Sequence, residues 1–179
     1  NPEATPIFLE IIDGDTPTDS STFEESEINI TRTNKKRMKI NDYYMEKYCD
    51  INSYHIPNIT EIIDTSGNVT EKPYHEKAQD VWLNLGIPVM SIITNKDLGV
   101  VNSGIYEIES FNPIMVNGNE YTDIDFMKTF VVCYAMTNHK VQSITITTPF
   151  IIHEWEKMTP RERYTAYSRG TKKENIKII

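Results

Sequence analysis

Residues 131–136 form a short apolar run that breaks abruptly into a polar and basic turn at 137–142. Apolar runs of this length, bounded by turn signals, predict buried strands. Residues 144–152 form a second β-rich run that Pro149 interrupts, and residues 28–31 alternate between apolar and polar positions. Residues 176–179 predict a last strand. Because ligands in open α/β sheets bind beyond the carboxyl ends of the strands, the polar residues after these runs are candidate ligand contacts.

Three segments have the features of helices. Apolar residues recur at helical spacing in 34–48, with basic residues on the remaining faces, so a helix is predicted directly after the strand at 28–31. Residues 74–85 predict a second helix, which ends at Gly86. A third helix is predicted at 160–169, because Thr159 and Glu162 form a capping box around Pro160.

The segment 86–130 differs from its surroundings. It contains short β-rich stretches at 89–94, 105–108 and 121–126, and its residues 116–120 carry a hairpin signal. Such spacing predicts a small antiparallel barrel or meander. We therefore expect an α/β domain formed by 1–85 and 131–179, with 86–130 as an inserted β-rich subdomain. Near the start, 7–12 predicts a strand or a helix end, and 13–26 an acidic loop.

Composition and charge limit the class of protein. Apolar residues make up 39% of the chain and aromatic residues 10%, which is typical of a globular protein. We see no signal peptide and no apolar run long enough to span a membrane. A net charge of −8 argues against a stand-alone nucleic-acid binder, but the bases are concentrated at 32–39 and near the C-terminus. Cys49 and Cys133 form no CxxC pair, which excludes a classical zinc site and favours an intracellular, reducing compartment.

Three polar clusters follow or face predicted strand ends, and each lies in a segment that resembles a known motif. ITRTNKKRMKIN (30–41) resembles motif IV of superfamily 1 DNA helicases, YAMTNHKVQS (134–143) resembles motif V, and RYTAYSRG (163–170) resembles motif VI. VVNSGIYEIE (100–109) is similar to a segment of the β domain inserted in these enzymes. The form is most similar to the Pif-like and RecD-like enzymes of the 5′→3′ branch, in a version reminiscent of large DNA viruses. Ser143 departs from the pattern, because glycine is usual there.

The resemblance implies an α/β fold: a second RecA-like parallel-sheet domain with an inserted small β-barrel of the Src-homology-3 type. It implies that Arg169 is an arginine finger for the γ-phosphate of ATP, that Arg32 is a second γ-phosphate contact with Arg37 as its rival, and that Gln142 links the nucleotide to the nucleic-acid track. Contacts to the backbone of single-stranded DNA are implied for the following residues: Thr33, Asn34, Thr137, His139 and Lys140.

No phosphate-binding G-x-x-x-x-G-K-[ST] motif and no paired acids after an apolar run occur in the chain. By the resemblance, ATP and Mg²⁺ are therefore held mainly by a first RecA-like domain of the same polypeptide, outside this chain, and the fragment alone is expected to be inactive. Replication proteins are further expected partners. We expect no metal site, because the HEWE segment at 153–156 lacks the second histidine of H-E-x-x-H.

Simpler interpretations compete with these. Arg169 also suits the C-terminal end of a helix, where it would stabilise the helix dipole. Arg32 and Arg37 are typical of a solvated basic face. Trp82 and Trp155 are best interpreted as packing residues. The alternative for the whole chain is a binding module that has kept a helicase-like fold without the motor, which Ser143 and the acidic loop at 13–26 favour.

Overall fold

The computed structural model describes residues 26, 28–63, 65–75 and 78–179, and the chain divides into two compact units. Unit one combines the described residues up to 40 with 134–179, and unit two is 41–133. The segment predicted at 7–12 and nearly all of the acidic loop predicted at 13–26 lie outside the described residues. The predicted domain boundaries at 85/86 and 130/131 stay a prediction.

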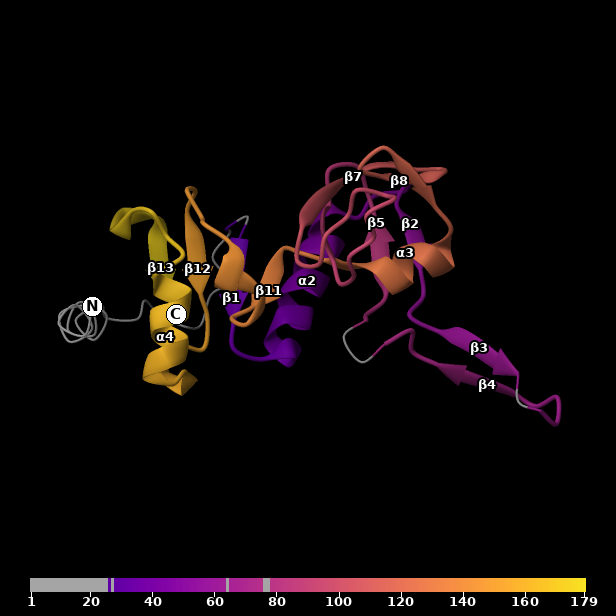
Figure 1. The fold of residues 1–179 in the computed structure, drawn as a ribbon, viewed down its shortest axis with the longest axis horizontal. Helices are drawn as coiled ribbons and strands as arrows, with labels where there is room; N and C mark the ends of the chain where they lie inside the picture. Colours follow the sequence, from indigo (N-terminus) through magenta and orange to yellow (C-terminus); the bar gives the residue numbers. More distant parts are fainter. Residues whose placement is uncertain (1–25, 27, 64, 76–77) are drawn as a thin grey trace. The chain divides into compact units, whose positions relative to one another are not determined.

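Unit one is built on a four-stranded sheet in which every neighbouring pair is parallel (Figure 1). The predicted strands at 28–31 and near 176–179 are confirmed, whereas only the end of the apolar run 144–152 is a strand. Most of the strand residues are buried, as parallel sheets require. The order is β11-β1-β12-β13, with bounds β11 Ala135–Thr137, β1 Ile28–Thr31, β12 Phe150–Ile152 and β13 Ile176–Ile178.

The strand order creates a switch point in unit one. From β1, the chain returns first to β11 on one side and then to β12 on the other. The chain therefore leaves the carboxyl end of β1 toward one edge of the sheet and the carboxyl end of β12 toward the other edge. Open α/β sheets bind their ligands at such a point. A mixed α/β fold with a parallel sheet, as predicted, is confirmed.

Helices follow the sheet strands closely. Two residues separate the end of β1 from helix α2 (Asn34–Tyr48), whose predicted bounds are confirmed. Helix α4 (Pro160–Tyr167) begins at the predicted capping box, in which Thr159 accepts from the Glu162 amide and Glu162 accepts from the Thr159 amide. Three 3-10 turns complete the unit: η1 Lys140–Ser143, η2 Trp155–Lys157 and η3 Lys173–Asn175.

Unit two contains a five-stranded antiparallel sheet. The predicted hairpin is confirmed, and Asn117 and Gly118 at its turn have φ angles of 52° and 69°, as a type I′ turn needs. Among the described residues the pairing ends at β9 and β10, and closure into a small barrel stays a prediction. The order is β10-β6-β7-β8-β9, with bounds β10 Phe130–Val132, β6 Pro88–Ser91, β7 Ile105–Phe111, β8 Ile114–Val116 and β9 Asn119–Tyr121.

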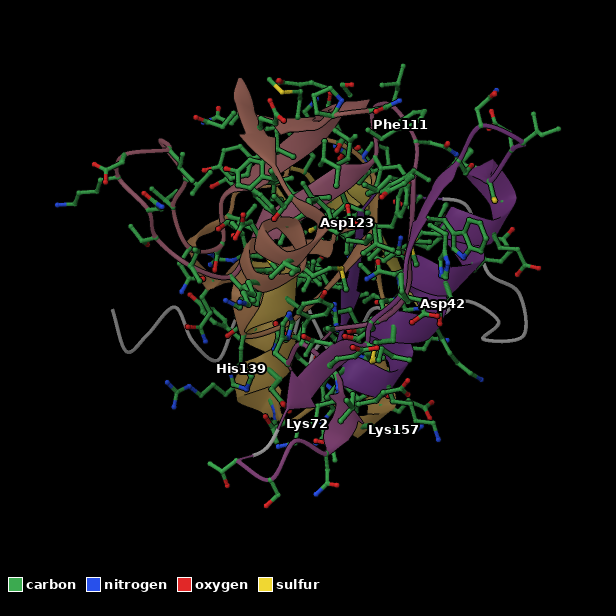
Figure 2. The ribbon with its side chains drawn as sticks, turned by 90° about the vertical axis from the view of Figure 1, so that its right-hand side faces the viewer. Asp42, Lys72, Phe111, Asp123, His139 and Lys157 are labelled. Carbon is green, nitrogen blue, oxygen red and sulfur yellow. The ribbon has the colours of Figure 1, made fainter. Side chains whose placement is uncertain are left out.

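Two strand predictions need correction. Residues 121–126 are mostly not a strand, because helix α3 (Asp123–Thr129) begins there. Thr122 caps this helix by accepting from the Asp125 amide, and Asp123 adds a negative charge to its first turn (Figure 2). The apolar run 131–136 is not one strand either, since β10 belongs to the antiparallel sheet and β11 to the parallel one.

Two separate two-stranded ribbons complete unit two. One pairs β2 (Tyr54–Ile56) with β5 (Val81–Leu83), and the other pairs β3 (Thr60–Ile63) with β4 (Val69–Lys72). The helix predicted at 74–85 is wrong, because its described residues contain the strand β5 and no helix. Val81 and Leu83 are buried while Trp82 between them is 39% exposed, which is the two-residue period of a strand.

Candidate functional site

At the switch point, Glu154 from the turn after β12 holds the segment that follows β1. Its carboxylate accepts from the backbone N–H groups of Arg32, at 3.1 Å, and Thr33, at 3.0 Å. The hydroxyl of Thr33 donates to the same carboxylate at 3.1 Å and accepts from the Lys36 amide at the start of α2. These bonds satisfy donors at a helix N-terminus, where a negative charge is favoured. Nothing in the sequence pattern indicates this role for Glu154.

Arg32 contacts the first turn of α4. Its Nε atom lies 3.5 Å from Oε2 of Glu162, and its side chain is 39% exposed. The Thr159 amide, which donates to the carboxylate, and the nearby charge of Arg32 both lower the pKa of Glu162, and burial opposes them. Arg37, the rival of Arg32 in the sequence prediction, is only 3% exposed. Of these two arginines, Arg32 is therefore the one that solvent or a ligand reaches directly.

Asn138 links the polar turn after β11 to the end of β1 and to the first turn of α4. Its backbone N–H donates to the carbonyl of Thr31 at 2.8 Å, and its side-chain amide donates to the carbonyl of Glu162 at 2.9 Å. The Asn138 side chain is buried, and its Oδ1 atom has no hydrogen-bond partner among the described residues. Glu162 thus contacts both the segment after β1, through its carboxylate, and the segment after β11, through its carbonyl. Neither Asn138 nor this role of Glu162 was predicted.

The predicted DNA contacts after β11 differ in exposure. Thr137 ends β11 and is half-buried, His139 is exposed (Figure 2), and Lys140 is half-buried at the start of η1. Asn34, the first residue of α2, is also exposed, whereas the half-buried Thr33 is engaged by Glu154. His139, Lys140 and Asn34 therefore present polar groups at the carboxyl edge of the sheet.

Arg169 lies just after the other end of α4 and is fixed by three hydrogen bonds. Its guanidinium donates from Nη1 to the carbonyl of Gln142 at 2.7 Å, from Nε to the carbonyl of Thr165 at 3.1 Å and from Nη2 to the hydroxyl of Ser168 at 2.8 Å. The structure thus brings together two predicted site residues, Arg169 and Gln142. The side chain of Gln142 itself is exposed.

A backbone bridge reinforces this contact. The amide of Ile146 donates to the carbonyl of Arg169 at 2.8 Å, and the amide of Thr171 donates to the carbonyl of Ile146 at 3.1 Å. Between them, Gly170 is packed so closely that an added Cβ would lie 2.9 Å from ring and side-chain carbons of Phe150 and Ile176. The backbone at Arg169 is therefore fixed by both pairing and packing.

Metal binding finds no support in the described residues, which contain no group of three or more metal-ligating side chains. His153 of the HEWE segment is 1% exposed, and its Nε2 atom lies 2.8 Å from Oδ1 of Asn29. Asn29 uses its Nδ2 atom to donate to two carbonyls, so its Oδ1 accepts and the Nε2 atom of His153 carries the proton. Burial lowers the pKa of His153 to about 3, so the ring is a neutral structural group.

In the described part of the chain, no helix is both long and apolar enough to cross a bilayer. No family model and no curated protein matches the sequence. Solved structures do match. Pif1 from Bacteroides bound to single-stranded DNA has a TM-score of 0.63 at 19% identity, over 97% of this chain and 45% of that one. Bacteroides Pif1 in complex with ADP-AlF3 and single-stranded DNA has a TM-score of 0.61 at 19% identity, with the same shares.

Pif1 helicase from Candida albicans has a TM-score of 0.58 at 12% identity, over 99% of this chain and 53% of that one. The chain thus spans about half the length of the solved structures that it matches. These neighbours are Pif1 helicases, and a Pif-like helicase is what the sequence resemblance predicted. Over nearly its whole length, this chain has the fold of the corresponding part of a Pif1 helicase.

Proposed function

We propose that this chain is the second RecA-like domain of an ATP-dependent DNA helicase, with a β subdomain of the Src-homology-3 type inserted in it. The observation that carries the proposal is the hydrogen bond from Arg169 to the carbonyl of Gln142, since it joins the two segments that resemble motifs V and VI. The fold shared with Pif1 structures that contain ADP-AlF3 or single-stranded DNA supports it.

Two arginines serve the nucleotide in this proposal. A guanidinium is planar and permanently charged, so it can neutralise charge that develops on a phosphoryl group in transfer. Arg169 supplies this group from its position after α4, and the exposed Arg32 supplies a second contact. The phosphates and Mg²⁺ are held by a first RecA-like domain of the same polypeptide. Gln142, whose backbone holds Arg169, relays the nucleotide state to the DNA-binding turn.

The DNA contacts come from the carboxyl edge of the sheet. His139, Lys140 and Asn34 bind backbone phosphates of single-stranded DNA, and Thr137 assists them. Such contacts position the strand without reading its sequence. We further propose an intracellular, reducing compartment for the protein, which suits the exposed free thiol of Cys49.

The test is a substitution at Arg169 in the full-length parent protein. Arg169→Ala is expected to lower the rate of ATP hydrolysis at least about a thousandfold, the range typical of an arginine finger. Binding of single-stranded DNA, measured by fluorescence anisotropy without nucleotide, is expected to stay nearly unchanged. Arg161→Ala is the matched control, because Arg161 is an exposed arginine in the first turn of the same helix.

Unchanged ATP turnover in Arg169→Ala would refute the motor assignment. Loss of DNA binding by a variant whose thermal unfolding is unchanged would favour the alternative, a non-catalytic binding module on a helicase-like fold. A phosphate-binding loop and paired acids in the polypeptide upstream of this chain would independently support the motor.

A further inference from the structure

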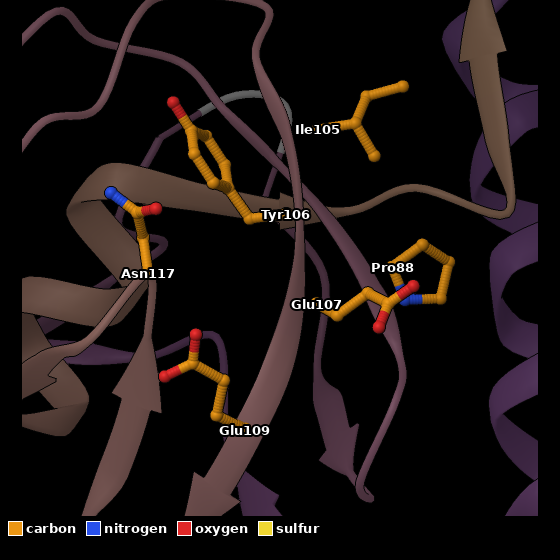
Figure 3. Close-up of a pocket in the computed structure, with 6 residues that line it drawn as sticks. All are labelled: Pro88, Ile105, Tyr106, Glu107, Glu109 and Asn117. Atoms are coloured by element: carbon orange, nitrogen blue, oxygen red, sulfur yellow. The ribbon is translucent and has the colours of Figure 1, made fainter.

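Unit two carries an open groove that is lined by none of the residues of the candidate site. Its volume is about 410 Å³, and it is lined by residues of β6, of β7 and of the turn between β8 and β9 (Figure 3). The lining residues include two acids and no base: Pro88, Ile105, Tyr106, Glu107, Glu109 and Asn117.

The acids lie on one face of β7. Exposed and less exposed residues alternate along the first half of this strand, so that Ile105, Glu107 and Glu109 share its outer face. Consecutive residues on one face of a strand are about 7 Å apart. The face therefore presents one apolar side chain followed by two carboxylates, and the register of β7 against β8 shifts between Ile108 and Ser110, at the second carboxylate.

These carboxylates keep their charge uncompensated within the described chain. Glu109 accepts from the backbone amide of Gly118, at 3.0 Å from Oε2, and this neutral donor fixes the side chain without cancelling its charge. The carboxylate of Glu107 has neither an ion pair nor a hydrogen bond among the described residues. Pro88 on β6 pairs in register with Glu107. Pro88 and Ile105 form the apolar part of the groove, and Ile105 is 42% exposed.

Charge complementarity decides what this groove can accept. Two carboxylates repel the phosphates of a nucleic acid, and the groove offers no basic side chain to offset them. A basic side chain is attracted to them, and an aliphatic neighbour can cover Ile105 and Pro88. In an extended peptide, side chains on one face are also about 7 Å apart, as expected for Ile105 and Glu107 in the regularly paired first part of β7.

We propose that this groove binds an extended segment of a partner protein that presents an apolar residue and two basic residues at alternate positions. The apolar residue packs on Ile105 and Pro88, and the basic residues pair with Glu107 and Glu109. The inserted β-rich region is thereby a docking site for a protein, and this assignment stands independently of the motor function proposed above.

The test uses a fluorescein-labelled peptide in which leucine, arginine and arginine occupy alternate positions, separated by serines. We expect saturable binding by fluorescence anisotropy that weakens as salt is added. In the matched peptide, the second arginine is moved by one position, so that its side chain points to the other face. We expect it to bind about tenfold more weakly. Backbone amide shifts in an NMR titration should map to Ile105, Glu107 and Glu109.

Glu107→Gln is the first variant, because the Glu107 carboxylate holds no other described group in place. It is expected to weaken peptide binding several-fold, and Glu107→Arg to weaken it more than tenfold. Glu71→Gln, which removes an equal charge from the exposed strand β4, is expected to leave binding unchanged. The thermal midpoint of each variant verifies that it is folded.

Four outcomes would overturn the proposal. One is equal binding of the two peptides. Another is a Glu107→Arg variant that is folded and binds as tightly as the original chain. The third is a thymidine oligonucleotide that displaces the peptide and shifts the same amides, because the groove would then belong to a DNA track. Absence of measurable binding by either peptide at low salt would also contradict it.

Discussion

Arg32 and Glu162 form an ion pair, with Nε and Oε2 3.5 Å apart, and this pair joins the segment after β1 to the first turn of α4. Glu162 also completes the capping box of that helix and accepts from the Asn138 side chain through its carbonyl. A single residue therefore connects all three segments that resemble helicase motifs. If Arg32 contacts a phosphate, as proposed, its guanidinium must either leave Glu162 or bind the phosphate and Glu162 together.

Glu162 variants separate capping from ion pairing. Glu162→Ala removes both, and we expect it to lower the free energy of unfolding by about 1 kcal/mol, the usual value of a helix cap. Glu162→Gln keeps an acceptor for the Thr159 amide and loses the charge, so we expect it to recover most of that stability. Urea denaturation of the two variants checks this. Equal destabilisation by both would show that the charge, rather than the cap, is what matters.

His153 predicts a specific dependence of stability on pH. Its pKa is about 3 in the folded chain and about 6.5 in the unfolded chain. Between these values only the unfolded state binds the proton, so the stability that the neutral ring provides is complete above pH 6.5 and is lost as the pH falls toward 3. The expected slope is about 1.4 kcal/mol per pH unit.

Urea denaturation from pH 7 to pH 4 measures that slope. His153→Gln retains a side-chain amide donor for Oδ1 of Asn29 and removes the titrating ring. We expect a lower stability at pH 7 and a shallower dependence on pH in this variant. His139→Gln is the matched control, because it removes an exposed histidine and leaves His153 in place. An unaltered slope in His153→Gln would mean that other groups set the acid sensitivity.

Glu154 is expected to stabilise the start of α2. Its carboxylate accepts from two amides and a hydroxyl, and its own backbone has a φ of 60°, which is unusual for a residue other than glycine. We expect Glu154→Ala to cost about 1.5–3 kcal/mol, the range for hydrogen bonds to a charged group.

In Glu154→Ala, amide hydrogen exchange should be faster at Arg32 and Thr33, the two donors that lose their acceptor. The control is Glu156→Ala, two residues away in an exposed position of η2, which we expect to change stability by less than about 0.5 kcal/mol. Unchanged exchange at Arg32 and Thr33 in Glu154→Ala would show that water replaces the carboxylate without loss.

Lys140 provides a test of the DNA track in the full-length parent. If Lys140 neutralises one phosphate, Lys140→Ala should weaken binding of single-stranded DNA and reduce the slope of log K against log salt by about 0.7. Fluorescence anisotropy over a range of salt concentrations measures both. Lys96→Ala, in an exposed turn of unit two, is expected to leave the slope unchanged; a slope that Lys140→Ala does not alter would remove Lys140 from the track.

Local signals explain which elements were predictable. The helix 34–48 and the cap at Thr159 depend on residues a few positions apart, and both were predicted with nearly the right bounds. The segments 74–85 and 121–126 were assigned wrongly, because each contains only a short apolar pattern that suits either a strand or a helix. The run 131–136 could not be divided from sequence, since buried residues of both sheets are equally apolar.

The candidate site was predictable only in part, for a similar reason. The resemblance to helicase motifs identified Arg169 and Gln142, and the structure places a hydrogen bond between them. Glu154 and Asn138 act through partners more than 100 positions away along the chain, at Arg32, Thr33 and Thr31. No local pattern encodes such contacts. The roles proposed for the site residues in nucleotide and DNA binding stay predictions until the substitutions are made.

Gly170 makes the position of the proposed arginine finger sensitive to a single methyl group. A Cβ at 170 would meet Phe150 and Ile176, from β12 and β13, at 2.9 Å, so these strands leave no room for any side chain there. An alanine at this position would alter no charge and no hydrogen-bonding group. It would nevertheless displace the guanidinium of Arg169 from the position in which it is proposed to contact a phosphate. If Arg169 has the proposed role, steric bulk at position 170 alone would disable the motor, with every residue proposed to touch its ligands intact.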